Sequence, residues 1–276
     1  MSGQTSSSRL IAALPMYDFP QLEAAHDELW SALCRSLIDA GVDETPAQLT
    51  RGTDRGEVWT HPFLLLGQGC EYPLAKFFAD RVRLVATPRY SVPGCDGAMY
   101  RSAIMVRVDD AAETLADLRN RRCAVNERTS NSGMNLLRAS IAPLANGERF
   151  FESVVLSGSH HKSVQMVADG DADVAAVDCV SLAHFRRLYP SSIVPLRILA
   201  WTARAPSLPY ITAAATSDEV LQKLRSSLAG IIADRKLTEA REQLFLEGVD
   251  LEPAGDYAEV LQLEGAAARL GYPKLF

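Results

Sequence analysis

The chain has 276 residues, of which 47% are hydrophobic and 22% are charged, and its formal net charge is −6. This length suits one large domain or two of ordinary size with a substantial core. The negative balance and the lack of a long Lys/Arg run argue against a nucleic-acid partner, and no apolar run approaches the ~20 residues of a membrane span.

The polar N-terminal segment, residues 1–8, is expected to be disordered. A secretory signal needs a basic start and an apolar stretch of ~7–15 residues, which this segment does not have. We therefore expect a cytoplasmic protein, or a periplasmic one if a signal peptide has been removed. The five cysteines have no CxxC spacing, so we predict no zinc cluster. We predict no other metal site and no cofactor. Cys70 and Cys95 lie in turn-like contexts, and their pairing is left open.

Predicted strands and helices alternate along the chain, a pattern typical of an α/β fold with mostly parallel sheets. Residues 10–14 form the first predicted strand. Tyr17 follows it and is a candidate ligand contact, because ligands of open α/β sheets bind beyond the carboxyl ends of strands. A helix comes next, with one face made of Leu22, Leu29, Leu33 and Leu37. A short helix is predicted over residues 74–80, and residues 100–108 are expected to form one long strand.

The turn with the clearest functional pattern follows a predicted strand at residues 123–126. It reads Ser130, Asn131, Ser132 and Gly133, and a helix with apolar spacing comes directly after it. Free N–H groups and the positive end of the helix dipole meet at such a turn, which suits an oxyanion. The alternative is that these side chains only cap the helix.

Two later turns carry similar residues at strand ends. His160 follows the predicted strand 154–156, and Asp178 ends the strand 174–177. The three turns together indicate a site rich in hydrogen-bond donors with one acceptor. Asp178 could bind a ligand amine or cap the next helix. No G-x-S-x-G, H-E-x-x-H, P-loop or G-x-G-x-x-G motif is present.

These turns and the segment 168–178 resemble the phosphate/phosphite/phosphonate-type substrate-binding proteins of ABC transporters. The resemblance covers the chain from the first strand to about Leu246. It implies a type II periplasmic-binding-protein fold, in which two α/β lobes joined by two crossing segments hold a ligand in the cleft between them. The family's usual Ser-Thr-Ser run has Asn131 in its middle here.

By this resemblance, Ser130, Ser132 and the N–H groups near Gly133 hold the oxyanion, and His160 adds a hydrogen bond or a positive charge. Tyr100 lines the cleft. The full set of predicted ligand-binding residues is Ser130, Asn131, Ser132, Gly133, His160, Tyr100, Tyr17, Asp178 and Trp201. We predict lobe one as residues 9–102 plus 204–276 and lobe two as residues 103–203.

The favoured function is a non-catalytic solute-binding protein for a small anionic or zwitterionic ligand. It would serve an ABC-transporter permease or act as a cytoplasmic sensor. The alternative is a biosynthetic enzyme on the same fold that uses His160 with Asp178 or Cys70. A third reading is an α/β protein whose polar turns only cap helices.

Overall fold

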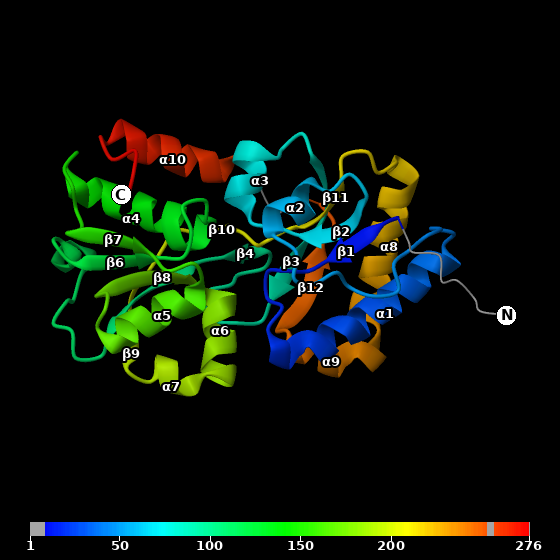
Figure 1. Cartoon of the computed structure of the whole chain (residues 1–276), viewed down its shortest axis with the longest axis horizontal. Coiled ribbons are helices and arrows are strands. Elements are labelled where there is room, and N and C mark those ends of the chain that lie inside the picture. Colours follow the sequence, from blue (N-terminus) through cyan, green and yellow to red (C-terminus); the bar gives the residue numbers. More distant parts are fainter. Residues whose placement is uncertain (1–8, 253–256, 276) are drawn as a thin grey trace. The chain divides into compact units, whose positions relative to one another are not determined.

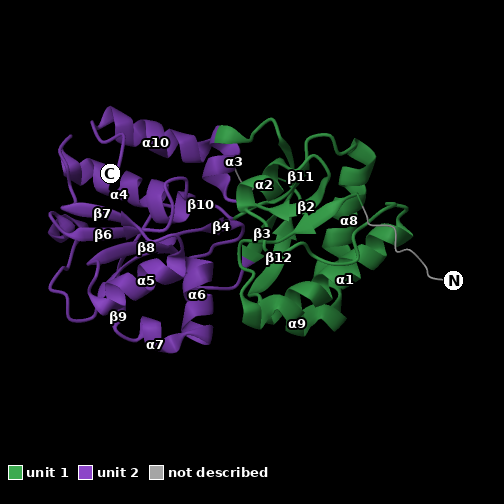
Figure 2. Cartoon of the chain, in the orientation of Figure 1, with its two compact units in different colours: residues 1–69, 77–89, 208–254 green, residues 70–76, 90–207, 255–276 purple. Residues whose placement is uncertain are grey.

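The computed structural model describes residues 9–252 and 257–275, so the predicted disorder of residues 1–8 lies outside the described residues. The chain divides into two compact units (Figure 2). Unit 1 contains residues 1–69, 77–89 and 208–254, and unit 2 contains residues 70–76, 90–207 and 255–276. Each unit has a sheet with helices packed on it, as an α/β fold requires.

The sheet of unit 1 has the strand order β1 (Ile11–Ala13), β2 (Leu64–Gln68), β11 (Tyr210–Ala213), β3 (Val82–Tyr90) and β12 (Leu246–Asp250). β1 and β2 are parallel, whereas β11 runs antiparallel to β2 and β3. The helices of this unit are α1 (Glu23–Asp39), α2 (Arg55–Thr60), α8 (Asp218–Ala233) and α9 (Thr238–Gln243). The predicted leucine face of the first helix is confirmed, because all four leucines are buried.

The sheet of unit 2 has the strand order β7 (Ser153–Leu156), β6 (Arg122–Val125), β8 (Val174–Asp178), β5 (Ser102–Arg107) and β9 (Leu196–Trp201). β6 is parallel to β7 and β8, and β5 is antiparallel to β8 and β9. Both sheets are therefore mixed, where mostly parallel sheets were expected.

Helices cover both faces of the sheet in unit 2. Figure 1 shows α4 (Leu136–Ala145) and α10 (Glu259–Arg269) on one side and α5 (His160–Asp169), α6 (Cys179–Leu188) and α7 (Pro190–Ile193) on the other. α3 (Glu71–Phe77) begins three residues earlier than predicted. Short 3₁₀ turns complete the list: η1 (Pro20–Leu22), η2 (Leu115–Leu118) and η4 (Arg235–Leu237).

The predicted long strand over residues 100–108 is divided in two. Tyr100 belongs to β4 (Met99–Tyr100), which pairs with β10 (Ala205–Pro206) in a small antiparallel sheet. From Ser102 onward the chain pairs with β8 in the main sheet. The two halves have different partners, and this explains the break at Arg101.

The two units have other boundaries than the predicted lobes. Four segments that were predicted in lobe one lie in unit 2, namely residues 70–76, 90–102, 204–207 and 255–276. α10 packs against α4, the Asn135 side chain donates to the carbonyl of Val260 (2.9 Å), and Arg138 donates to that of Pro273 (3.1 Å). These contacts attach the C-terminal segment to unit 2.

Among the described helices, none has both the length and the apolar character needed to cross a bilayer.

Candidate functional site

The turn after β6 is the start of the helical segment that leads into α4. Ser130 is the N-cap, and its hydroxyl accepts the N–H of Gly133 at 3.0 Å. The next residues form a π-helical turn, η3 (Asn131–Asn135), which continues into α4. The capping interpretation is therefore correct for the oxygen of Ser130, whose hydroxyl hydrogen can still be donated elsewhere.

Side chains from the three predicted turns meet in unit 2. Ser130 Oγ lies 3.3 Å from Ser132 Oγ, and Ser132 Oγ lies 2.9 Å from His160 Nε2. Asp178 Oδ2 lies 3.5 Å from the same nitrogen of His160. We call Ser130, Ser132, His160 and Asp178 the polar row. Its members lie at or after the carboxyl ends of β6, β7 and β8, which are neighbours in the sheet, so the topology brings them together.

Two members of these turns also fix helix starts. Ser159, directly before His160, caps α5 through the N–H of Lys162 (3.2 Å). Asp178 caps α6 by accepting the N–H of Ser181 at its Oδ1 (2.8 Å). Asp178 thus uses one oxygen for the cap and turns the other toward His160.

Gly133 is required by close packing. A Cβ at this position would lie 1.9 Å from Asn126 Oδ1 and 3.2 Å from His160 Cε1. Asn126 is itself buried at the end of β6. A larger residue would displace the Asn126 side chain and press on the imidazole, so glycine keeps the polar row compact.

Asn131 lies in a buried hydrogen-bond network and is fully enclosed. Its side-chain amide donates to Tyr100 OH (3.1 Å), and its oxygen accepts from the Asn135 side chain (2.9 Å). Its backbone N–H points to the sulfur of Cys70 at 3.4 Å. Sulfur is a weak acceptor, so this N–H is held without a strong partner.

Glu71, which follows Cys70, is a buried residue that the sequence analysis did not predict. Its side chain is fully buried, and its Oε2 accepts a weak hydrogen bond from the Cys70 thiol (3.7 Å). Burial, with a smaller contribution from the charge of Asp178, raises the pKa of Glu71 to about 8. The carboxyl group is therefore mostly neutral at pH 7. A charged residue between Cys70 and Tyr72 was the only signal in the sequence, and nothing local indicates its burial.

Burial and the nearby Glu71 also change the pKa values of Cys70 and Tyr100. Burial and the nearby Glu71 raise the pKa of Cys70 well above its ordinary value. Burial also raises the pKa of Tyr100, with Glu71 adding to the effect. Both groups are protonated at neutral pH. Tyr100 is thus a neutral hydrogen-bonding group.

The remaining predicted contacts, Tyr17 and Trp201, are not members of the polar row. Tyr17 belongs to unit 1, where it is buried and its carbonyl faces His26 Nε2 (3.2 Å). Trp201 ends β9 and lines a cavity of about 390 Å³ in unit 2, together with Cys95, Arg101 and Arg204. No member of the polar row lines that cavity. The Cys70–Cys95 pairing is also absent: all five cysteines are free, and Cys95 faces Cys179.

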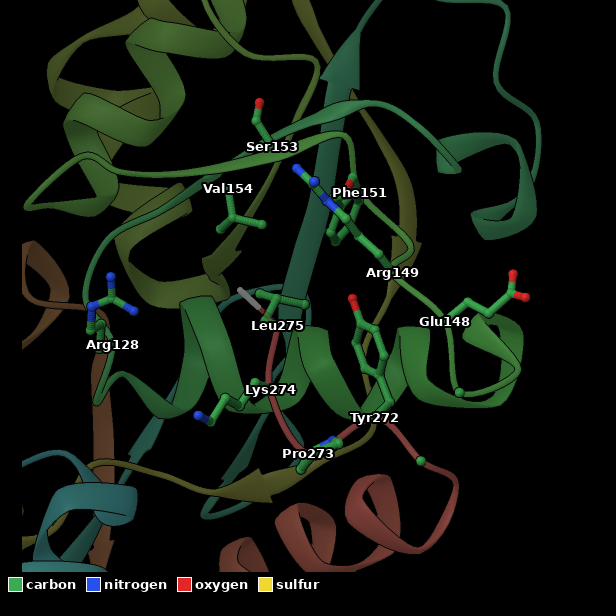
Figure 3. A pocket seen from close by; sticks show the side chains of 12 residues that line it. Arg128, Glu148, Arg149, Phe151, Ser153, Val154, Tyr272, Pro273, Lys274 and Leu275 are labelled. Carbon is green, nitrogen blue, oxygen red and sulfur yellow. Dashed lines mark hydrogen bonds between the residues drawn. The ribbon is translucent and has the colours of Figure 1, made fainter.

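A second cavity in unit 2, of about 600 Å³, lies between α4, β7 and the C-terminal segment (Figure 3). Arg128, Arg149 and Lys274 supply positive charge around it, and Glu148 is its acidic residue. Arg128 comes from the turn that also carries Ser130, yet the polar row does not line this cavity. Within residues 9–252 and 257–275, no group of three His, Cys, Asp or Glu residues is arranged to hold a metal ion.

The sequence also matches a known family model. The family model described as "ABC transporter, phosphonate, periplasmic substrate-binding protein" matches residues 68–253, more than half of the chain.

Solved structures show the same fold at low sequence identity. A binding-protein component of an ABC phosphonate transporter from Pseudomonas aeruginosa is 16% identical, with 95% of this chain and 87% of that chain covered and a TM-score of 0.73. PhnD1 from Prochlorococcus marinus in complex with methylphosphonate is 11% identical, with 95% and 99% covered and a TM-score of 0.73. XAC2383 from Xanthomonas citri bound to ATP is 16% identical, with 96% and 98% covered and a TM-score of 0.71. These likenesses establish the two-lobed periplasmic-binding-protein fold.

Proposed function

The chain belongs to the ABC-transporter family of periplasmic phosphonate substrate-binding proteins, and from this premise we propose that its polar row binds the oxyanion of a phosphonate-type ligand. The role is non-catalytic capture of a small molecule. Ser130, Ser132 and His160 would contact the ligand oxygens, with the backbone near Gly133 contributing an N–H group.

The observation that carries this proposal is the hydrogen-bonded contact from Ser130 through Ser132 to His160. Both hydroxyls can turn their hydrogens toward a ligand oxygen, and hydrogen bonds to a charged acceptor are stronger than neutral ones. The positive end of the helix that begins at η3 adds to the attraction. The N–H of Asn131 now faces only a thiol, so an anionic oxygen would be a better partner for it.

Asp178 supports a zwitterionic ligand in particular. With Glu71 mostly neutral, Asp178 is the member of the polar row that can pair with an ammonium group. A phosphonate that also carries an amine would then place its oxyanion on the serines and its amine toward Asp178. Tyr17 and Trp201 stay proposed contacts of lower priority.

The enzyme alternative is not favoured. In a Ser-His-Asp triad the serine and the carboxylate contact opposite nitrogens of the imidazole, whereas here both contacts fall on Nε2 of His160. The raised pKa of Cys70 keeps it as a thiol at neutral pH, and a thiol is a poor nucleophile.

The family is described as periplasmic, and we propose that this chain also works outside the cytoplasmic membrane and delivers its ligand to a permease. Fractionation of cells that express the native gene tests this. Recovery with cytoplasmic marker enzymes alone would instead support the sensor function.

Titration calorimetry with methylphosphonate, an aminoalkyl phosphonate, inorganic phosphate and sulfate tests the ligand assignment. We expect a phosphonate to bind best, and the double variant Ser130→Ala/Ser132→Ala to lose about two to four orders of magnitude in affinity, because each of the two lost hydrogen bonds to a charged group contributes about 1.5–3 kcal/mol. Ser140→Ala is the matched control, since Ser140 lies on α4 and donates to the carbonyl of Leu136 (2.9 Å). Unchanged binding in the double variant would place the ligand elsewhere.

A further inference from the structure

Two thiols that do not belong to the polar row lie in contact in unit 2. Cys95 Sγ is 3.4 Å from Cys179 Sγ. Cys95 belongs to the loop between β3 and β4, and Cys179 is the first residue of α6, directly after Asp178. The proposed ligand-binding function does not involve these two cysteines.

The backbone holds both cysteines in place. The N–H of Cys95 donates to the carbonyl of Val92 (3.1 Å), and that of Cys179 donates to the carbonyl of Arg101 (3.1 Å). Gly94 lets the loop approach α6: its φ is +102°, and a Cβ there would lie 2.7 Å from Cys179 Cβ and 2.8 Å from the Trp201 ring. The two sulfur atoms therefore need to close by only about 1.4 Å to reach disulfide length.

A reagent can reach one of the two thiols. Cys95 is partly exposed and lines the 390 Å³ cavity, whereas Cys179 is 2% exposed. Arg101 and Arg204 line the same cavity, with Asp96 paired to Arg204. A cavity with two guanidinium groups next to a thiol suits a small anionic disulfide such as oxidised glutathione.

We propose that Cys95 and Cys179 are a redox-active thiol pair that closes to an intramolecular disulfide by exchange with a small anionic disulfide. The thiolate of Cys95 attacks one sulfur of the reagent, forms a mixed disulfide and releases one reagent thiolate. Cys179, as a thiolate, then attacks Cys95 Sγ and releases the second reagent thiolate. The two thiol protons end on the two released thiols, so the protein loses two electrons and the reagent gains them.

The exchange is slow at neutral pH. The hydrogen bond with Cys179, burial and the negative charge of Asp178 raise the pKa of Cys95 above its ordinary value. The test therefore needs a long incubation. The product would tie the loop between β3 and β4 to the N-terminus of α6, across 84 positions of the chain (179 minus 95).

The experiment incubates the reduced protein overnight with oxidised glutathione, then unfolds it and labels the free thiols with a maleimide for intact-mass measurement. We expect three labels instead of five on the wild-type chain, and one peptide that links Cys95 to Cys179 after non-reducing digestion. Cys95→Ser and Cys179→Ser should each keep four labelled thiols or carry only a glutathione adduct. Cys34→Ser, a control in unit 1, should still lose two.

A melting curve gives an independent readout. The bridged protein should melt several degrees higher than the reduced one, and a dithiol reductant should reverse the shift, because the bridge restricts the unfolded chain. Five labels on the oxidised wild type, a bridge between other cysteines, or a mixed disulfide on Cys95 that never resolves would each overturn the proposal. The Cys95 variant keeps the test valid if replacement of the more deeply buried Cys179 impairs folding.

Discussion

Replacement of Glu71 by glutamine should make the protein more stable than the wild type, by an amount that grows between about pH 5 and pH 8. Folding raises the pKa of this carboxyl from 4.5 to about 8. Between these values the unfolded chain is ionised while the folded chain keeps its proton, so the free energy of unfolding falls as pH rises. The slope is about 1.4 kcal/mol per pH unit. Over the 3.5 units (8 minus 4.5) the loss is of the order of 5 kcal/mol.

Glu71→Gln removes the ionisation and keeps nearly the same volume. The difference in unfolding free energy between variant and wild type should therefore rise from pH 5 to pH 8 and become constant above that. Urea unfolding followed by far-UV circular dichroism, at one-unit steps from pH 5 to pH 9, measures it. Glu148→Gln, at an exposed position after α4, is the matched control for the substitution.

Parallel pH curves for wild type and Glu71→Gln would refute the reasoning. They would mean that the Glu71 carboxyl reaches water or a positive partner in solution, and that its burial does not control its charge. A constant offset between the curves would report only the lost or gained hydrogen bond of the amide.

Three further substitutions test the site and its support. Gly133→Ala should lower the free energy of unfolding by about 1–3 kcal/mol through overpacking against Asn126, and should weaken phosphonate binding; denaturation and calorimetry measure the two effects. Tyr100→Phe should cost about 1–3 kcal/mol, measured by urea unfolding, because the buried Asn131 amide loses its acceptor. Asp173→Asn should lower the melting temperature at pH 7. Arg122 lowers the pKa of Asp173 below 3.8, so the stability it supplies is present above that value and is lost as pH falls further; melting curves at pH 3 and pH 7 should show a smaller difference in acid.

Local sequence patterns predicted much of the candidate site. Ser130, His160 and Asp178 each follow an apolar strand, and polar residues at the carboxyl ends of neighbouring strands meet in an α/β sheet. The order of three such turns was therefore enough to predict the polar row. The apolar spacing of the first helix predicted its buried face for the same reason, since helix periodicity is a local property.

The features that could not be predicted from the sequence depend on tertiary structure. The burial of Glu71 comes from packing that no spacing rule encodes, and the contact between Cys95 and Cys179 joins positions 84 residues apart (179 minus 95). Contacts with Asn135 and Arg138 attach α10 and the residues after it to unit 2. Nothing in the sequence distinguishes these two residues from polar residues on the exposed face of a helix. The direction of the strands could not be predicted either, because the sequence of β5 has the pattern of a buried strand whether its neighbours are parallel or antiparallel.

The π-helical turn η3 makes the length of this segment as important as its composition. The N–H of Leu136 donates to the carbonyl of Asn131, five residues back, so the turn holds one residue more than an α-helical turn. Deletion of a single residue here would restore regular helix geometry and improve the local hydrogen bonding. It would leave the residues on either side of the turn nearly in place, because five residues of π-helix and four of α-helix each make about one turn. The deletion would instead remove one of the residues Asn131–Asn135, three of which carry the contacts to Tyr100, His160 and Ser130 described above. Protein engineers who graft this turn onto another scaffold must therefore keep all five of its residues.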